Sequence, residues 1–74
     1  MAHASDARLV VATVQQVLPR LGLAYVVDEE DRCWGITRST PGADLDQLDE
    51  GRHVRLTIEE HGRAAIASAW APLD

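Results

Sequence analysis

Lysine is absent from this 74-residue chain, and cysteine occurs only once, at Cys33. A single cysteine excludes an internal disulfide framework and a cysteine-based zinc set, and it indicates a reducing, cytoplasmic setting. No apolar run approaches the roughly 20 residues that a membrane-spanning helix needs, so we expect no membrane span. Residues 1–7 lack the basic region and apolar stretch of a signal peptide, and we expect them to form a disordered leader.

Positive charge is also scarce, because seven arginines stand against twelve Asp and Glu residues and give a net charge of −5. Non-specific binding to phosphates depends on clustered Lys and Arg, so this balance argues against strong non-specific nucleic-acid binding. The acids gather in segments 28–31 and 44–50. We expect segment 28–31 to be a solvated turn, which leaves room for a neutral or mildly basic face elsewhere.

The length and composition allow one small domain, which we place over residues 8–74. Hydrophobic residues make up 46% and charged residues 26% of the chain, as in ordinary globular proteins. A domain of this size buries only about 60% of the surface of its unfolded chain, so its core is marginal. In this core we expect Trp70 to fill space among the small residues of the last strand.

Segment 8–18 fits two patterns. As a helix it would be capped by Ser5, with Val10, Val14 and Val17 at helical spacing. As a strand it benefits from five β-branched residues among the eight from 10 to 17, which are stiff at χ1 and favour extended backbone. Pro19 would break the last helical turn. We therefore predict a strand, and the alternative is an α+β domain in which residues 5–18 are helical.

Four further segments have the character of strands: 23–27, 32–37, 53–59 and 64–70. The clearest is 53–59, where Val54, Leu56 and Ile58 alternate with polar residues. Leu45 and Leu48, spaced i and i+3, indicate one helical turn in the long connection 39–51. Five short strands separated by turn signals predict an all-β domain, a small antiparallel barrel.

Several of these segments are similar to motifs of the cold-shock domain family. Segment 21–26, Leu-Gly-Leu-Ala-Tyr-Val, aligns with the family's Lys-Gly-Phe-Gly-Phe-Ile, and segment 33–37, Cys-Trp-Gly-Ile-Thr, aligns with Val-Phe-Val-His-Phe. Segment 48–54 matches the family's Leu-x-Glu-Gly-x-x-Val. The resemblance covers about residues 10–73. It implies a five-stranded OB-like barrel that binds single-stranded RNA or DNA on the face of its first three strands.

The family binds single strands by stacking bases on exposed aromatic rings beside a basic groove. At the aligned positions only Tyr25 and Trp34 keep a ring, and the resemblance implies that they share a face. Arg20 and Arg38 lie beside this face, and Gln16 occupies an aligned position on the first strand. The first hypothesis is therefore a weak nucleic-acid-binding module that uses these five residues.

The second hypothesis is a protein-interaction module that has lost nucleic-acid binding. Aliphatic side chains replace most of the family's aromatics, and they would form an exposed apolar patch of the kind that marks protein contacts. The patch would bind a protein partner or a second copy of the chain through Val17, Leu21, Leu23 and Ile36. The alternative is a one-residue difference in register, which would bury these side chains.

The sequence offers little for catalysis. No Ser, His and Asp arrangement and no glycine-rich phosphate loop occurs, so we expect no enzyme activity and no cofactor. His3, His53 and His61 are scattered without ligand spacing, and segment 28–31 lacks the spacing of a calcium loop. We therefore expect no metal site.

Overall fold

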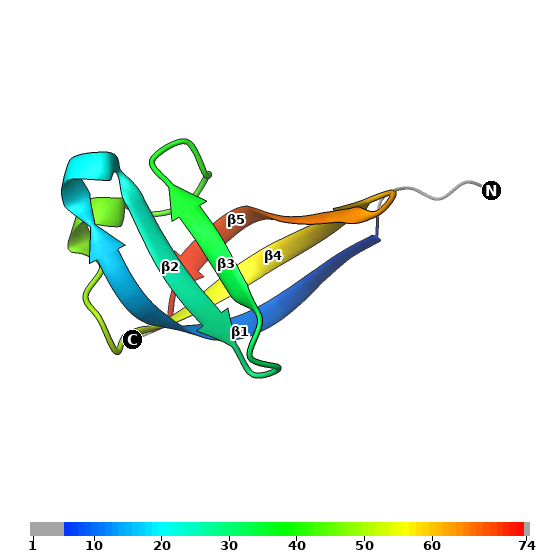
Figure 1. Ribbon diagram of the computed structural model, residues 1–74, viewed down its shortest axis with the longest axis horizontal. Coiled ribbons are helices and arrows are strands. Elements are labelled where there is room, and N and C mark those ends of the chain that lie inside the picture. Colours follow the sequence, from blue (N-terminus) through cyan, green and yellow to red (C-terminus); the bar gives the residue numbers. More distant parts are fainter. Residues whose placement is uncertain (1–5, 74) are drawn as a thin grey trace.

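The computed structural model describes residues 6–73 and consists almost entirely of antiparallel β-strands (Figure 1). The strands are β1 Asp6–Leu18, β2 Leu23–Asp28, β3 Cys33–Thr37, β4 His53–His61 and β5 Ala64–Pro72. Two short 3-10 helices, η1 Pro19–Leu21 and η2 Leu45–Gln47, lie in the connections. No helix among the described residues is long and apolar enough to cross a membrane.

The all-β prediction is confirmed, and the alternative with a helix over residues 5–18 is wrong because residues 6–18 form β1. The β-branched residues and Pro19 therefore outweigh the helical spacing in this segment. The helical turn expected at Leu45 is present as η2. Of the expected leader, residues 1–5 lie outside the described residues, whereas Asp6 and Ala7 belong to β1.

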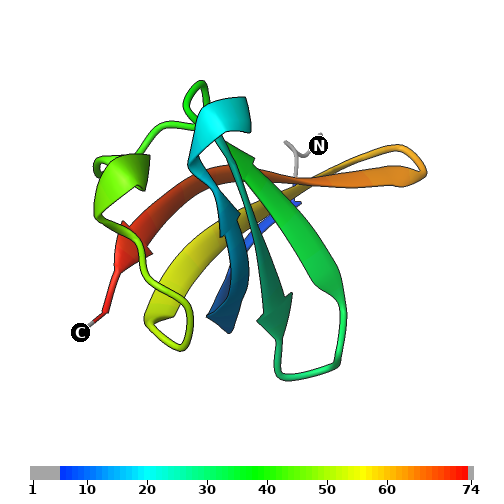
Figure 2. The same cartoon turned by 60° about the vertical axis from the view of Figure 1, so that its left-hand side comes forward.

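A single long strand organises the sheet. The strand order is β3-β2-β1-β4-β5, so β1 lies in the centre. Its first half pairs with β4, its second half pairs with β2, and Ala12 and Thr13 pair with both neighbours. A β-bulge between Val14 and Gln16 increases the local bend. The sheet therefore curls into a half-barrel that resembles a small OB barrel (Figure 2).

The concave side of the half-barrel holds the core. Alternate residues of each strand point inward, among them Val54, Leu56 and Ile58 of β4, all completely buried. Trp70 is buried as expected, with 4% of its surface exposed. The other buried apolar residues are Ala12, Val14, Ala24, Val26, Trp34, Ile36, Leu45 and Leu48.

A segment of the β3–β4 connection, residues 40–44, crosses the end of β5, and we call it the strap. The backbone N–H of Trp70 donates to the carbonyl oxygen of Pro41 at 3.0 Å. Gly42 lies so close to Trp70 that a Cβ atom at this position would be 2.3 Å from the Trp70 carbonyl oxygen. Only glycine permits this approach, which places the strap directly against the end of β5.

The other end of the sheet extends beyond the core as a three-stranded ribbon. It consists of the first half of β1, the second half of β4 and the first half of β5, and it lies at the far right of Figure 1. This extension accounts for the long dimension of 41 Å against 23 and 20 Å for the other two. Leu9 and Ile66, which belong to the ribbon, are 62% and 50% exposed.

Candidate binding face

The convex side of β1, β2 and β3 carries three rows of side chains, which we call the outer face. Strand register defines the rows, because residues that pair across antiparallel strands project to the same side of the sheet. The first row lies next to η1, the second lies in the centre, and the third lies at the opposite end. The rows are Leu18, Leu23 and Thr37; Gln16, Tyr25 and Gly35; and Thr13, Val27 and Cys33.

Trp34 does not belong to this face. It pairs with Val26, points into the core and is only 9% exposed, whereas Tyr25 pairs with Gly35 and is 37% exposed. The prediction that Tyr25 and Trp34 share a face is therefore wrong. The alignment with the cold-shock motif placed β3 one residue out of register, which exchanges the two faces of a strand.

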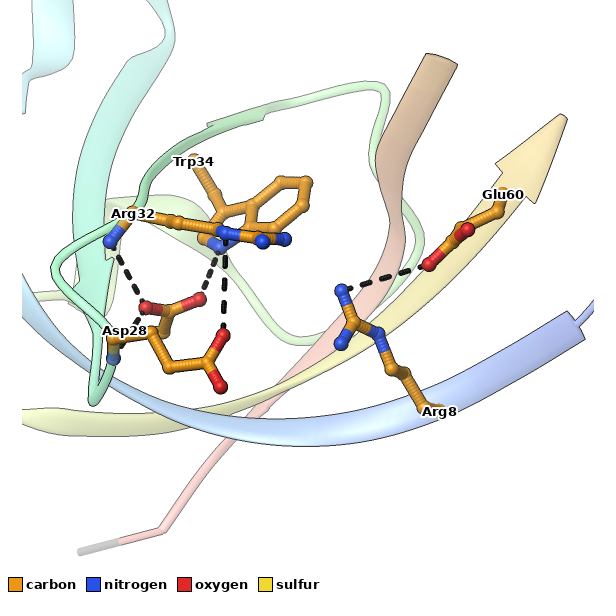
Figure 3. Close-up of polar contacts among 6 residues, drawn as sticks. Arg8, Asp28, Arg32, Trp34 and Glu60 are labelled. Atoms are coloured by element: carbon orange, nitrogen blue, oxygen red, sulfur yellow. Dashed lines mark hydrogen bonds and ion pairs between the residues drawn. The ribbon is translucent and has the colours of Figure 1, made fainter. Parts of the chain in front are cut away.

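A buried hydrogen bond holds Trp34 inward (Figure 3). Its indole Nε1–H donates to Oδ2 of Asp28 at 2.9 Å. Oδ1 of the same carboxylate accepts the backbone N–H groups of Glu30 at 2.8 Å and Arg32 at 3.0 Å. Asp28 thus closes the β2–β3 turn and anchors an aromatic side chain at the same time.

The carboxylate of Asp28 is stabilised in its charged form. Burial by itself would raise its pKa, but the hydrogen bonds from Trp34, Arg32 and Glu30, together with the charge of Arg32, lower the pKa below the ordinary value. The expectation of a solvated turn over segment 28–31 is wrong for this first residue. Its sequence signal is an aspartate at the end of an apolar strand, where the side chain can bond to backbone N–H groups further along the turn.

Tyr25 lies at the centre of the outer face. It pairs with Gln16 on one side and with Gly35, which has no side chain, on the other. A shallow hollow in this region is lined by Gln15, Gln16, Tyr25, Cys33 and Glu50. The face therefore offers one aromatic ring and neutral polar groups, with a carboxylate at its rim.

The two predicted phosphate-binding arginines differ in their surroundings. Arg20 is exposed on η1. Arg38 instead donates to Oδ1 of Asp46 at 2.8 Å and to the carbonyl oxygen of Pro19 at 3.0 Å. Arg38 therefore links η1 to η2, and its guanidinium already has acceptors within the chain.

The predicted aliphatic patch is only partly assembled. Leu21 is 71% exposed on η1, and Leu23 lies half-buried on the outer face. Val17 packs against the core, and Ile36 is completely buried, so the prediction of an exposed Ile36 is wrong for the same register reason as for Trp34. Sequence reasoning missed Leu18 and Pro19, which line a shallow hollow with Arg20 and Leu21.

The structure brings together two groups of the predicted site residues. Gln16 and Tyr25 share the middle of the outer face, and Leu23 and Leu21 lie at its η1 end. Within residues 6–73, no group of three or more His, Cys, Asp or Glu side chains is placed to hold a metal ion. Comparison of the chain with family models, with curated proteins and with solved structures gives no significant match.

Proposed function

We propose that this chain is a binding module that docks an apolar protein segment on its outer face. The observation that carries this proposal is the absence of charged residue types: none of the nine outer-face residues is Asp, Glu, Lys, Arg or His, although the protein has a net charge of −5. The neutral surface continues at one end into the exposed Leu21. Depletion of charged residues, with an aromatic side chain at the centre and polar groups around it, is typical of protein contacts.

Single-stranded nucleic acid is the second candidate, because Tyr25 presents a ring in the centre of the face with Gln16 beside it and Arg20 nearby in the chain. One stacked base contributes about 1–3 kcal/mol, so a single ring falls well short of a platform of several rings. The engagement of Arg38 with Asp46 and the carboxylate of Glu50 at the rim further disfavour phosphates. A protein segment needs neither rings nor cations and fits the face better.

Affinity capture with the full chain tests the proposal. Immobilised protein is incubated with a nuclease-treated lysate of the source cells, and four forms are compared: wild type, Tyr25→Ser, Leu21→Ser and Leu9→Ser. Leu9 is the matched control because it is also an exposed leucine but lies on the ribbon. We expect specific proteins to be retained by the wild type and Leu9→Ser and lost with Tyr25→Ser and Leu21→Ser.

Anisotropy of labelled oligo-dT and oligo-U at low and moderate salt separates the two candidates. We expect no binding in the micromolar range for any variant. Salt-sensitive binding that disappears in Tyr25→Ser would overturn the protein-docking proposal in favour of nucleic acid. Retention of the same proteins by all four forms would show that the outer face is not the binding surface.

A further inference from the structure

The second surface of interest is the free edge of β5. This strand is last in the order of the sheet and, among residues 6–73, pairs with β4 alone. On the other side of β5, the backbone N–H of Trp70 donates to the carbonyl oxygen of Pro41 in the strap. The strap reaches only this end of the strand. The opposite end, Ala64–Ala67, belongs to the ribbon, and no strand among residues 6–73 pairs with its outer edge.

Within Ala64–Ala67, this edge lacks the usual features that prevent strands from pairing with other chains. Exposed edge strands normally carry charged residues or proline, or another element covers them. From Ala64 to Ala71 the sequence is AAIASAWA, with neither charge nor proline, and Ile66 is half exposed. A β-bulge lies next to Ser68, beyond the stretch Ala64–Ala67. An uncharged, protruding edge of this kind is suited to accepting another strand.

We propose that the β5 edge pairs with the β5 edge of a second copy of this chain, antiparallel and about a twofold axis near Ile66. Self-pairing brings identical strands together, and like charges placed opposite one another would destabilise it. The uncharged stretch Ala64–Ala71 removes this penalty. A twofold arrangement closes on itself and uses the same patch on both copies, so it does not continue into fibres.

The charges at the two ends of the edge are complementary in this arrangement. Arg63 precedes the free edge, and Asp44 of the strap lines a small cavity together with Trp70 and Arg52 at the other end. There the guanidinium of Arg52 lies 3.9 Å from a carboxylate oxygen of Asp49. Antiparallel pairing directs Arg63 of each copy toward the strap of the other copy. Two opposite-charge contacts related by the twofold axis would therefore flank the paired strands, which favours a second copy over an arbitrary apolar strand.

This inference does not depend on the proposed docking function. β3 and β5 contact each other across the opening of the half-barrel, but the pairing uses the backbone edge of β5 in the ribbon, whereas the outer face is the convex side of β1, β2 and β3, so the outer face stays open (Figure 1). The dimer would present two outer faces at once. Two linked faces would raise the apparent affinity for any partner that carries two docking segments.

Sedimentation velocity of the full chain between about 10 µM and about 1 mM tests the pairing, because a dimer is favoured by concentration. We expect the wild type to dimerise with rising concentration and Ile66→Lys to stay monomeric with an unchanged far-UV circular dichroism spectrum. Leu21→Lys is the matched control, since it places the same charge on an exposed leucine of η1. This variant should dimerise like the wild type.

Hydrogen exchange provides a readout that is specific to the edge. Amides in segment 64–67 should exchange more slowly at the higher concentration, whereas those of β3 should not change. Arg63→Glu should weaken the dimer several-fold at low salt. A wild type that is monomeric at about 1 mM, or a dimer that Leu21→Lys disrupts and Ile66→Lys does not, would overturn the proposal.

Discussion

Replacing Asp28 by asparagine tests whether the buried contact with Trp34 stabilises this fold. Asparagine keeps the shape of the side chain, and its carbonyl oxygen can still accept the backbone N–H groups of Glu30 and Arg32. The amide N–H₂ group then replaces the oxygen that accepts from the Trp34 indole at 2.9 Å. Two donors would face each other in a buried site, and the indole N–H would lose its only acceptor at that position.

The expected loss in the free energy of unfolding is about 2 kcal/mol, because a hydrogen bond to a charged group contributes about 1.5–3 kcal/mol and a buried donor left unpaired costs a similar amount. A domain of this size has a total stability of only about 4–11 kcal/mol. For a chain of this length, about 2 kcal/mol corresponds to a decrease in Tm of roughly 8–16 °C. Thermal unfolding at pH 7, monitored by circular dichroism, measures this decrease in Tm directly.

Two further variants test whether the hydrogen bond between Asp28 and Trp34 causes the loss of stability. Glu29→Gln removes a charge from the same turn at an exposed position and should change the stability by less than about 0.5 kcal/mol. Trp34→Phe removes the indole donor, and in a double-mutant cycle with Asp28→Asn the two effects should couple by about 0.5–3 kcal/mol. A Tm of Asp28→Asn within about 2 °C of the wild type, or no coupling in the cycle, would refute this reasoning.

The remaining predictions concern pH and the strap. The pKa of Asp28 is lower in the folded than in the unfolded protein. Its contribution to the free energy of unfolding is therefore present above about pH 4 and is lost as the pH falls through the pKa of the folded state. The Tm difference between wild type and Asp28→Asn should therefore shrink below about pH 4, and an unchanged difference there would contradict the assignment. Gly42→Ala should lower the Tm, because the added Cβ would be 2.3 Å from the Trp70 carbonyl oxygen. Gly35→Ala is the control, since its Cβ would meet only Leu23 at 3.8 Å, and an equal loss in both variants would count against the strap contact.

The fold was largely predictable from the sequence because local signals agree with each other. Alternation in segment 53–59, the β-branched residues before Pro19 and the turn at Gly22 each specify a strand or a turn without reference to distant residues. The five predicted strands are all present, with ends shifted by one or two residues. The expected turn of helix near Leu45 is present too.

The binding face was harder to predict because it depends on register. The segment from Cys33 to Thr37 contains aromatic, aliphatic and small residues in an order that does not by itself show which set points inward. A shift of one residue exchanges Trp34 and Ile36 with Cys33, Gly35 and Thr37. The information that decides between the two registers lies partly outside the strand, in the carboxylate of Asp28 that binds the indole.

This contact also determines the chemistry of the outer face. If Trp34 turned outward, it would give Tyr25 a second ring, but the Asp28 carboxylate would lose one of its three hydrogen bonds and the core would lose a large side chain. Both changes are costly in a domain whose core is small. The acidic turn between β2 and β3 therefore keeps the indole buried and leaves Tyr25 as the single ring of a neutral face. In this way a residue outside the outer face limits the face to one ring, which favours the proposed docking of an apolar protein segment over the stacking of a nucleic acid.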